Sequence, residues 1–342
     1  MAPPRLTVVL PNYNHAKLLP RALAALAAQT RQADEILMID DASTDDSLAV
    51  AATWQMRLPQ LRIIAQRPNR GVVETLRRGI AEASGDLVYL GAADDETRPA
   101  LFARCVAALE AHPQAALAAG EVRLVDPEGR FAGLRPAVLP SLTESYLDPA
   151  AFAAALRRGD HLVVSVGAVW RRVPLLAAGG IDPTLGAMVD AFLARELALQ
   201  HGIVFFPEVL GVWHINLGGV SRSAAANPHV TLDLIARARA RMEDRLGAPY
   251  PAWYPALFER RTRFAAARLL VIEPPGGRIN PSAVAMISGG GSLDRLALHI
   301  AQVLPGAAAR FAAMAWLTLR LRPYSVPALL ASWRDRRRRP RA

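Results

Sequence analysis

The chain of 342 residues contains one cysteine, Cys105, and one lysine, Lys17. A single cysteine excludes an intrachain disulfide and a zinc site built from cysteines, and it fits a reducing cytosol. No run of about 18 uncharged apolar residues occurs, so we expect no membrane-spanning helix. The first residues pass directly into a strand-like run that ends at Pro11, without the apolar core of a signal peptide, and we expect no secretory leader.

Arginine carries nearly all of the positive charge, and the formal net charge is +10. Half of that excess lies in residues 334–341, which hold six arginines and one acid. Such a tail fits contact with an anionic surface, either lipid or nucleic acid, or a disordered solubilising end. Hydrophobic residues make up 52% of the chain, enough for a sizeable core in one large or two ordinary domains.

The first part of the chain alternates strand and helix patterns. Strand-like runs occupy 6–10, 36–39, 61–64 and 87–90, and helical patterns occupy 18–29, 47–56 and 72–83, the last preceded by Gly71. This order predicts an α/β fold with a mostly parallel central sheet and helices on both faces. The glycine-rich fingerprint of dinucleotide-binding folds is missing after the first strand, which argues against a dehydrogenase.

After about residue 115 the alternation loosens. We expect short strands at 163–166 and 203–206, a helix at 189–200, and a helical, arginine-rich extension with breaks at 274–277 and 288–291. The predicted segments are therefore 1–115, 116–226 and 227–342. Within the last, residues 304–333 mix aromatic, aliphatic and arginine side chains, which fits either an interfacial amphipathic segment or a helix pair that closes over the first domain.

Four polar motifs follow the four predicted parallel strands. They are Pro11-Asn12-Tyr13-Asn14, Asp40-Asp41-Ala42-Ser43-Thr44-Asp45, Asn69-Arg70-Gly71 and Ala92-Ala93-Asp94-Asp95. The carboxyl ends of parallel strands meet at one edge of the sheet, where open α/β folds bind ligands. We therefore expect one crevice that offers an aromatic ring, carboxylates, an arginine and a free helix N-terminus.

This set of groups suits a nucleotide. A ring stacks on a base, a carboxylate accepts from the base or a ribose hydroxyl, and arginine and helix-end amides bind phosphate oxygens. Asp94 and Asp95 repel each other unless a cation such as a diphosphate-bound divalent ion is present. The alternative for this pair is a solvated turn with the start of a helix, because Thr97 and Pro99 follow.

With these motifs in this order, the chain resembles glycosyltransferase family 2, the inverting transferases with a GT-A fold. The resemblance covers about Leu6–Ser223. A later pattern adds to it: Val169-Trp170-Arg171-Arg172, then Gly179-Gly180-Ile181-Asp182, then Asp190. On this basis residues 1–115 form the nucleotide-sugar-binding half and 116–226 the acceptor side of one GT-A domain.

The resemblance implies roles for the donor-side residues. Pro11 and Tyr13 would flank the base, with Asn14 beside them, and Asp41 would accept from uracil or an equivalent imide. Asp94 would bind the ribose, and Asp95 would hold Mn²⁺ or Mg²⁺ through the diphosphate. Arg70 is preferred over Arg67 as the phosphate-binding residue, because it lies inside the Asn-x-Gly turn.

The resemblance also implies a general base, Asp190, which would deprotonate the acceptor hydroxyl as it attacks the anomeric carbon. Asp190 is alternatively only an N-terminal helix acid. The sequence departs from the family in four places: Ala92 replaces the leading acid, Leu76-Arg77 stand where many members have Arg-Asn, Val189 replaces a glutamate, and Trp213-His214 replaces a late arginine. His214 either reaches the diphosphate or metal or is a core or surface histidine.

The expected activity is transfer of a sugar from a nucleotide-diphosphate donor, UDP-sugar by preference, to a hydroxyl of a saccharide or lipid-linked acceptor. The alternative is a nucleotide-sugar-binding protein without catalysis, which the altered acid motif and Val189 favour. Nucleic-acid binding is not expected, since no other basic motif interleaved with aromatics occurs. We expect a cytoplasmic protein with a peripheral contact to the inner, anionic face of the plasma membrane.

Overall fold

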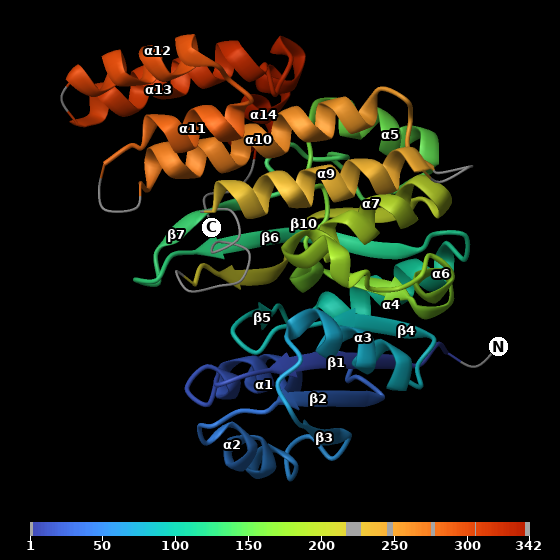
Figure 1. Ribbon diagram of the computed structural model, residues 1–342. Helices are drawn as coiled ribbons and strands as arrows, with labels where there is room; N and C mark the ends of the chain where they lie inside the picture. Colours follow the sequence, from blue (N-terminus) through green and yellow to red (C-terminus); the bar gives the residue numbers. More distant parts are fainter. Residues whose placement is uncertain (1–2, 217–226, 245–248, 275–277, 305, 339–342) are drawn as a thin grey trace. The chain divides into compact units, whose positions relative to one another are not determined.

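Figure 1 shows a computed structural model of the chain, which describes all residues except 1–2, 217–226, 245–248, 275–277, 305 and 339–342. The chain divides into two compact units. Unit 1 comprises Met1–Ile215 together with Ser332–Ala342, and unit 2 comprises Asn216–Ala331. The expected boundary at 226 and the end of the resemblance at Ser223 lie outside the described residues.

The predicted β-α alternation is confirmed in the first third of unit 1. The elements are β1 (Leu6–Asn12), α1 (Leu19–Ala27), β2 (Glu35–Asp41), α2 (Ser47–Trp54), β3 (Leu61–Gln66), α3 (Val72–Glu82) and β4 (Leu87–Leu90). Strands β3, β2, β1 and β4 lie side by side and parallel, in that order. Their carboxyl ends therefore share one edge, as the motif argument requires.

The rest of unit 1 widens the same sheet. The order continues β4-β9-β6-β10-β5, with β7 on β6 and β8 on β10, and β9 runs antiparallel to both its neighbours. The elements are β5 (Glu96–Thr97), α4 (Leu101–Ala111), β6 (Leu117–Val125), β7 (Phe131–Arg135), β8 (Ser145–Leu147), α5 (Pro149–Arg158), β9 (Ala168–Arg171), α6 (Arg172–Ala177), α7 (Val189–His201), β10 (Ile203–His214), and the 3₁₀ helices η1 (Ser165–Gly167) and η2 (Pro183–Met188).

The strand expected at 163–166 is wrong. Residues 162–164 are irregular, η1 follows, and the strand begins only at Ala168. The amide of Gly167 bonds back to the carbonyl of Val164, and the Val166 carbonyl accepts from the Tyr89 hydroxyl, so these groups are used in a turn. An apolar run of four residues cannot by itself distinguish a buried turn from a buried strand.

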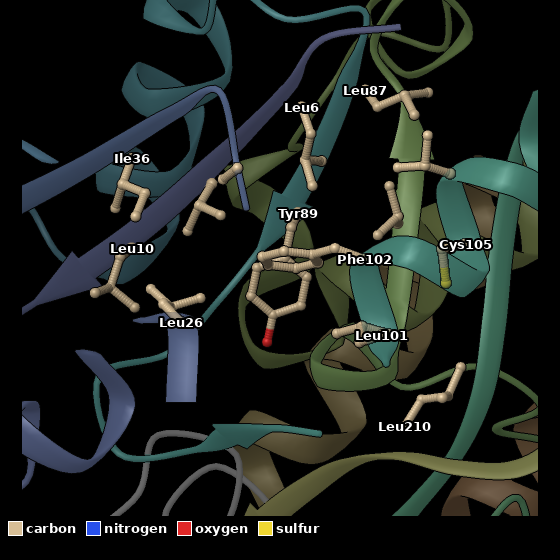
Figure 2. Packing of buried hydrophobic residues seen from close by; sticks show 14 of the residues in the cluster. Leu6, Leu10, Leu26, Ile36, Leu87, Tyr89, Leu101, Phe102, Cys105 and Leu210 are labelled. Carbon is tan, nitrogen blue, oxygen red and sulfur yellow. The ribbon is translucent and has the colours of Figure 1, made fainter. Parts of the chain in front are cut away.

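The two faces of the parallel sheet are covered by different helices. Leu6, Val8 and Leu10 alternate along β1 and pack with residues of α1 and α4 in one core cluster. Figure 2 shows Tyr89 of β4 against Phe102 of α4 in this cluster, with ring centroids 5.2 Å apart in an edge-on arrangement. Val9 faces the other side, where α3 lies so close that a Cβ on Gly79 would come within 2.2 Å of it.

Unit 2 is helical. Its elements are α9 (Pro228–Asp244), α10 (Tyr254–Ile272), α11 (Pro281–Ser288), α12 (Ser292–Val303) and α13 (Gly306–Leu321), and α14 (Val326–Arg338) begins in it. Its core gathers side chains from α10 to α13, among them Leu270, Val284, Leu298 and Leu317. Within the part of the chain that is described, no helix combines the length and apolarity needed to cross a membrane.

The second half of α14 belongs to unit 1. Asp335 on this helix is fully buried, and its carboxylate accepts from the Leu139 amide at 3.0 Å. Arg334 pairs with the same carboxylate at 2.8 Å. The arginine run that follows continues into residues 339–342, which lie outside the described structure.

Candidate functional site

The carboxyl end of β2 organises the loop after β1. Asp40 is buried, and one carboxylate oxygen accepts from the Asn12 side-chain amide at 2.9 Å. The other oxygen accepts from the Ser43 amide at 3.0 Å. Asn12 and Asp40 are also register partners across the parallel pair β1–β2. Asp40 therefore fixes the two loops at the sheet edge to each other.

The adjacent acid, Asp41, holds the loop after β3. Its carboxylate accepts from the amides of Arg70 at 2.7 Å and Gly71 at 2.8 Å. It also accepts from the Gln66 side chain at 2.7 Å. Gly71 has a φ of +83°, a conformation that favours glycine, and it is the N-cap residue before helix α3, which begins at Val72. The carboxylate proposed to bind the base is thus already bonded to the Asn-x-Gly turn, and its role toward a nucleotide stays a prediction.

The remaining donor-side residues lie at the same edge. Pro11 is buried, whereas Tyr13 is 46% exposed. Asn14, at a φ of +55°, accepts from the Thr44 amide at 2.8 Å and joins the first two motifs. Arg67 and Arg70 are both exposed, so their guanidinium groups face solvent at this edge. The structure therefore brings the first three motifs together.

The acidic turn after β4 is tied to β10 and α1. The Asp95 carboxylate accepts from the His214 amide at 2.9 Å, and the His214 ring contacts the Glu96 carboxylate at 2.5 Å. Arg21 of α1 donates to the Asp94 carbonyl at 2.5 Å and pairs with Glu96 at 3.3 Å. His214 therefore lies in the acidic cluster rather than in the core.

The surroundings of Asp95 disfavour its charged form. It borders a small, largely apolar pocket that is lined also by Leu10, Leu26 and Tyr89. Desolvation, followed by the neighbouring Asp94 charge, raises the pKa of Asp95 well above the usual aspartate range, although the His214 amide and Arg21 oppose this. A cation at Asp95 would relieve the same repulsion.

Asp190 lies in the first turn of α7 and is half-buried. One carboxylate oxygen accepts from the Ser165 hydroxyl at 2.8 Å, and the other accepts from the Ala191 amide at 2.7 Å. A carboxylate at this position is also favoured by the helix dipole. The position of Asp190 therefore suits both interpretations, a general base and an acid that only stabilises the helix N-terminus.

A short path of contacts joins Asp190 to the acidic turn. Ser165, which bonds to Asp190, is followed by Val166, whose carbonyl accepts from the Tyr89 hydroxyl at 3.3 Å. Tyr89 and Asp95 line the same pocket. Asp190 therefore does not lie on a remote surface but is joined to the acidic turn by neighbouring residues.

The later arginine pair serves as a structural link. Arg171 donates to the carbonyl of Leu109 in the last turn of α4 and to that of Ala115 in the loop after it. Arg172 donates to the Ile80 carbonyl near the C-terminal end of α3. Cations at helix C-termini complement the helix dipole. Asp182 caps η2 through the Thr184 amide at 2.9 Å.

Three residues of the site were missed by sequence reasoning: Arg21, Glu96 and Ser165. Glu96 adjoins the Asp-Asp pair and could have been found from that position alone. Arg21 and Ser165 give no local signal, because their partners lie 73 and 25 residues away in the chain.

Comparison with known proteins shows which family part of this chain is similar to. Residues 7–173 match the model of Glycosyl transferase family 2. The PGL/p-HBAD biosynthesis glycosyltransferase of Mycobacterium tuberculosis is 31% identical over 134 residues, which are 39% of this chain. The chain spans about half of that relative, 52% of its length. The amylovoran biosynthesis glycosyltransferase AmsE of Erwinia amylovora is 28% identical over 207 residues, which are 60% of this chain and 74% of AmsE.

Solved structures of similar fold extend over nearly the whole chain. S. aureus TarS 1-349 in complex with UDP-GlcNAc aligns with a TM-score of 0.63 at 14% identity and covers 92% of this chain and 90% of that one. The mannosyltransferase PcManGT from Pyrobaculum calidifontis in complex with GDP-Man and Mn²⁺ gives 0.53 at 21% identity, over 97% and 84%. At these identities the likeness shows the fold, and it confirms the predicted α/β sheet with a helical C-terminal region.

Proposed function

We propose that the chain, whose residues 7–173 match the model of Glycosyl transferase family 2, transfers a sugar from a nucleoside-diphosphate donor to an acceptor hydroxyl with inversion. The observation that carries the proposal is the contact path from Asp190 through Ser165 and Tyr89 to the pocket of Asp95. It joins a carboxylate suited to deprotonate an alcohol to an acidic turn suited to a cation.

On the donor side, the exposed Tyr13 ring would stack on the base, next to Pro11 and Asn14. Asp41 would present the turn that carries Arg70, and Arg70 would meet the diphosphate as a planar, bidentate donor. Asp94 would accept from the ribose. UDP is the preferred nucleotide, a choice supported by the UDP-GlcNAc complex of the structurally similar TarS.

A divalent metal fits the residues at the acidic turn. Among the described residues no group of three or more metal-ligating side chains occurs. Mg²⁺ characteristically binds one or two carboxylates together with substrate phosphates, so Asp95 suffices if the diphosphate supplies the other oxygens. When bound, Mn²⁺ or Mg²⁺ would neutralise charge that develops on the departing diphosphate. Burial and the neighbouring Asp94 raise the pKa of Asp95, and a cation bound there would offset both effects.

On the acceptor side, Asp190 would accept the hydroxyl proton as the acceptor oxygen attacks the anomeric carbon opposite the diphosphate. Ser165 would hold one carboxylate oxygen in place. One carboxylate suffices because the diphosphate is already a good leaving group, whereas a glycosidase needs two carboxyl groups. The acceptor would be a saccharide or a lipid-linked saccharide, and the arginine-rich C-terminal region would contact an anionic membrane.

The test combines donor binding with transfer. We expect UDP with Mn²⁺ to raise the melting temperature of the intact chain, and Asp190→Asn to retain this shift while transfer from UDP-sugars to saccharide acceptors falls by about 10²- to 10⁴-fold. Asp148→Asn is the matched control, because Asp148 also lies at a helix N-terminus and accepts from the Ala151 amide. That variant should keep full activity.

The outcomes separate the alternatives. If no nucleoside diphosphate shifts the melting temperature, the assignment of these residues as a donor-binding site is wrong. If donors bind but no sugar is transferred or hydrolysed by the unaltered chain, it is a nucleotide-sugar-binding protein without transferase activity, which Ala92 in place of an acid favours.

A further inference from the structure

Helix α12 exposes a row of large aliphatic side chains. Leu293, Leu296, Ile300 and Val303 are 76%, 56%, 61% and 85% exposed. Their spacing of three, four and three residues places them along one side of the helix. We call these four residues the α12 stripe. Single exposed aliphatic residues are ordinary, but a continuous row marks a binding surface.

The stripe is not the side of α12 that packs into unit 2. Leu298 and Ala301 lie on a different side and are buried in the core shared with α10, α11 and α13. Figure 1 shows α12 and α13 next to each other, in agreement with this shared core. Because Leu298 and Ala301 already pack α12 into the core of unit 2, the stripe residues are not needed for the packing of this unit.

The exposed charge of residues 281–331, the segment that carries the stripe, has one sign. Residues 281–331 contain four arginines, Arg295, Arg310, Arg320 and Arg322, and a single acid, Asp294. Asp294 is buried, and it accepts from the Gly291 amide at 3.0 Å and from the Trp316 indole at 3.1 Å. This segment therefore exposes no carboxylate, while the arginine side chains are exposed.

Helix α13 adds further apolar surface beside α12. Phe311 and Leu319 are 77% and 71% exposed, whereas Ala313 and Leu317 of the same helix are buried in the core. An exposed aliphatic row with aromatic and arginine neighbours and no exposed acid is the composition of a helix that lies in the boundary between lipid headgroups and acyl chains.

We propose that the α12 stripe inserts into the surface of an anionic membrane, with the neighbouring arginines on lipid phosphates. A second copy of the chain is a poorer occupant, because residues 281–331 of that copy would offer exposed arginines but no exposed carboxylate with which they could pair. The proposal deepens the membrane contact of the proposed function and names the residues that make it. A surface of this kind would hold the enzyme where a lipid-linked acceptor lies.

The experiment measures co-sedimentation of the full chain with vesicles, without donor or acceptor, so that its result is independent of transferase activity. We expect binding to vesicles of phosphatidylcholine mixed with phosphatidylglycerol, and much weaker binding to phosphatidylcholine alone or at about 0.5 M NaCl. The double variant Leu296→Gln/Ile300→Gln should bind at least about tenfold more weakly, because it removes two aliphatic side chains from the acyl boundary.

The matched control is Met56→Gln/Val173→Gln, which removes two aliphatic side chains that are 95% and 75% exposed in unit 1. It should bind vesicles like the unaltered chain, and both double variants should keep the melting temperature. Replacement of Arg339 and Arg341 by serine tests the tail separately.

Two results would overturn the proposal. Unchanged vesicle binding by the α12 variant, with binding lost on replacement of the tail arginines, would assign the contact to the tail. A dimer in light scattering that the α12 variant converts to a monomer, with vesicle binding unaltered, would show that a second copy covers the stripe.

Discussion

Replacement of Asp41 separates a structural role from a role in base recognition. The carboxylate is 3% exposed and accepts from one buried donor, the Gln66 side chain, and from two partly buried amides, those of Arg70 and Gly71. A hydrogen bond to a charged acceptor contributes about 1.5–3 kcal/mol, and the partly buried amides recover part of this by bonding to water. We therefore expect Asp41→Ala to lower the free energy of unfolding by about 3 kcal/mol.

In a unit of this size such a loss lowers the melting temperature by about 6–12 °C. Asp41→Asn keeps one acceptor oxygen but presents an amide nitrogen to another donor, so it should lose about half as much. Scanning fluorimetry measures both variants, and titration with UDP measures affinity. Asp46→Ala, an exposed aspartate with no side-chain cap bond, is the control and should melt within about 1–2 °C of the unaltered chain.

The reasoning is refuted if Asp41→Ala melts like the control. If that variant is stable yet binds UDP much more weakly, the carboxylate contacts the base directly, as the family resemblance implies. If stability and UDP affinity fall together, the carboxylate acts through the Arg70 turn.

Further predictions concern the acidic turn, the proposed general base Asp190 and the central sheet. Since burial and Asp94 raise the pKa of Asp95, its ionised form destabilises the fold, and Asp95→Asn should melt higher at pH 7.5 without metal. The gain in melting temperature should vanish as the pH falls below about 3.8, the ordinary aspartate pKa, because Asp95 is then protonated in both states. The variant should also lose the Mn²⁺-dependent part of the UDP-induced shift in melting temperature. A variant that melts lower than the unaltered chain at pH 7.5 would contradict the prediction. Ser165→Ala should lower kcat about tenfold with little change in KM, because it removes only a hydrogen bond to the proposed base; a change mainly in KM would instead place Ser165 on the substrate. Gly79→Ala should cost about 1–2 kcal/mol in urea denaturation, because its Cβ meets Val9 and helix propensity offsets only part of the strain; a double-mutant cycle with Val9→Ala that shows no coupling would contradict this.

Three strands of the parallel half, β1, β2 and β4, were predictable from sequence because they are almost fully buried. Each reads as a mostly apolar run, such as Val8–Leu10 before Pro11, and each is followed by polar residues at the same edge. The edge strand β3 is only partly buried and carries the exposed Arg62, but its short apolar core was enough to locate it. The strand misplaced at 163–166 belongs to the half where antiparallel and turn segments mix. There the deciding contacts, such as the Tyr89 hydroxyl on the Val166 carbonyl, come from 77 residues away.

The candidate site was predictable in its location more than in its internal bonding. The motif spacing led to the correct edge for Tyr13, Asn14, Asp41 and Arg70, since strand ends determine where loops begin. The sequence does not show that the Asp41 carboxylate accepts hydrogen bonds from the Arg70 and Gly71 amides. Those bonds depend on how the loop after β3 folds next to the end of β2.

The return of α14 to unit 1 limits how this protein can be shortened. Unit 2 interrupts unit 1 in the sequence, since the chain leaves unit 1 after Ile215 and re-enters it at Ser332. A version ended anywhere before Asp335 would leave the buried Leu139 amide without its acceptor, at a cost of about 1–3 kcal/mol. Unit 1 is therefore a discontinuous folding unit, and isolating it calls for splicing out the inserted helices rather than cutting the polypeptide at its first linker.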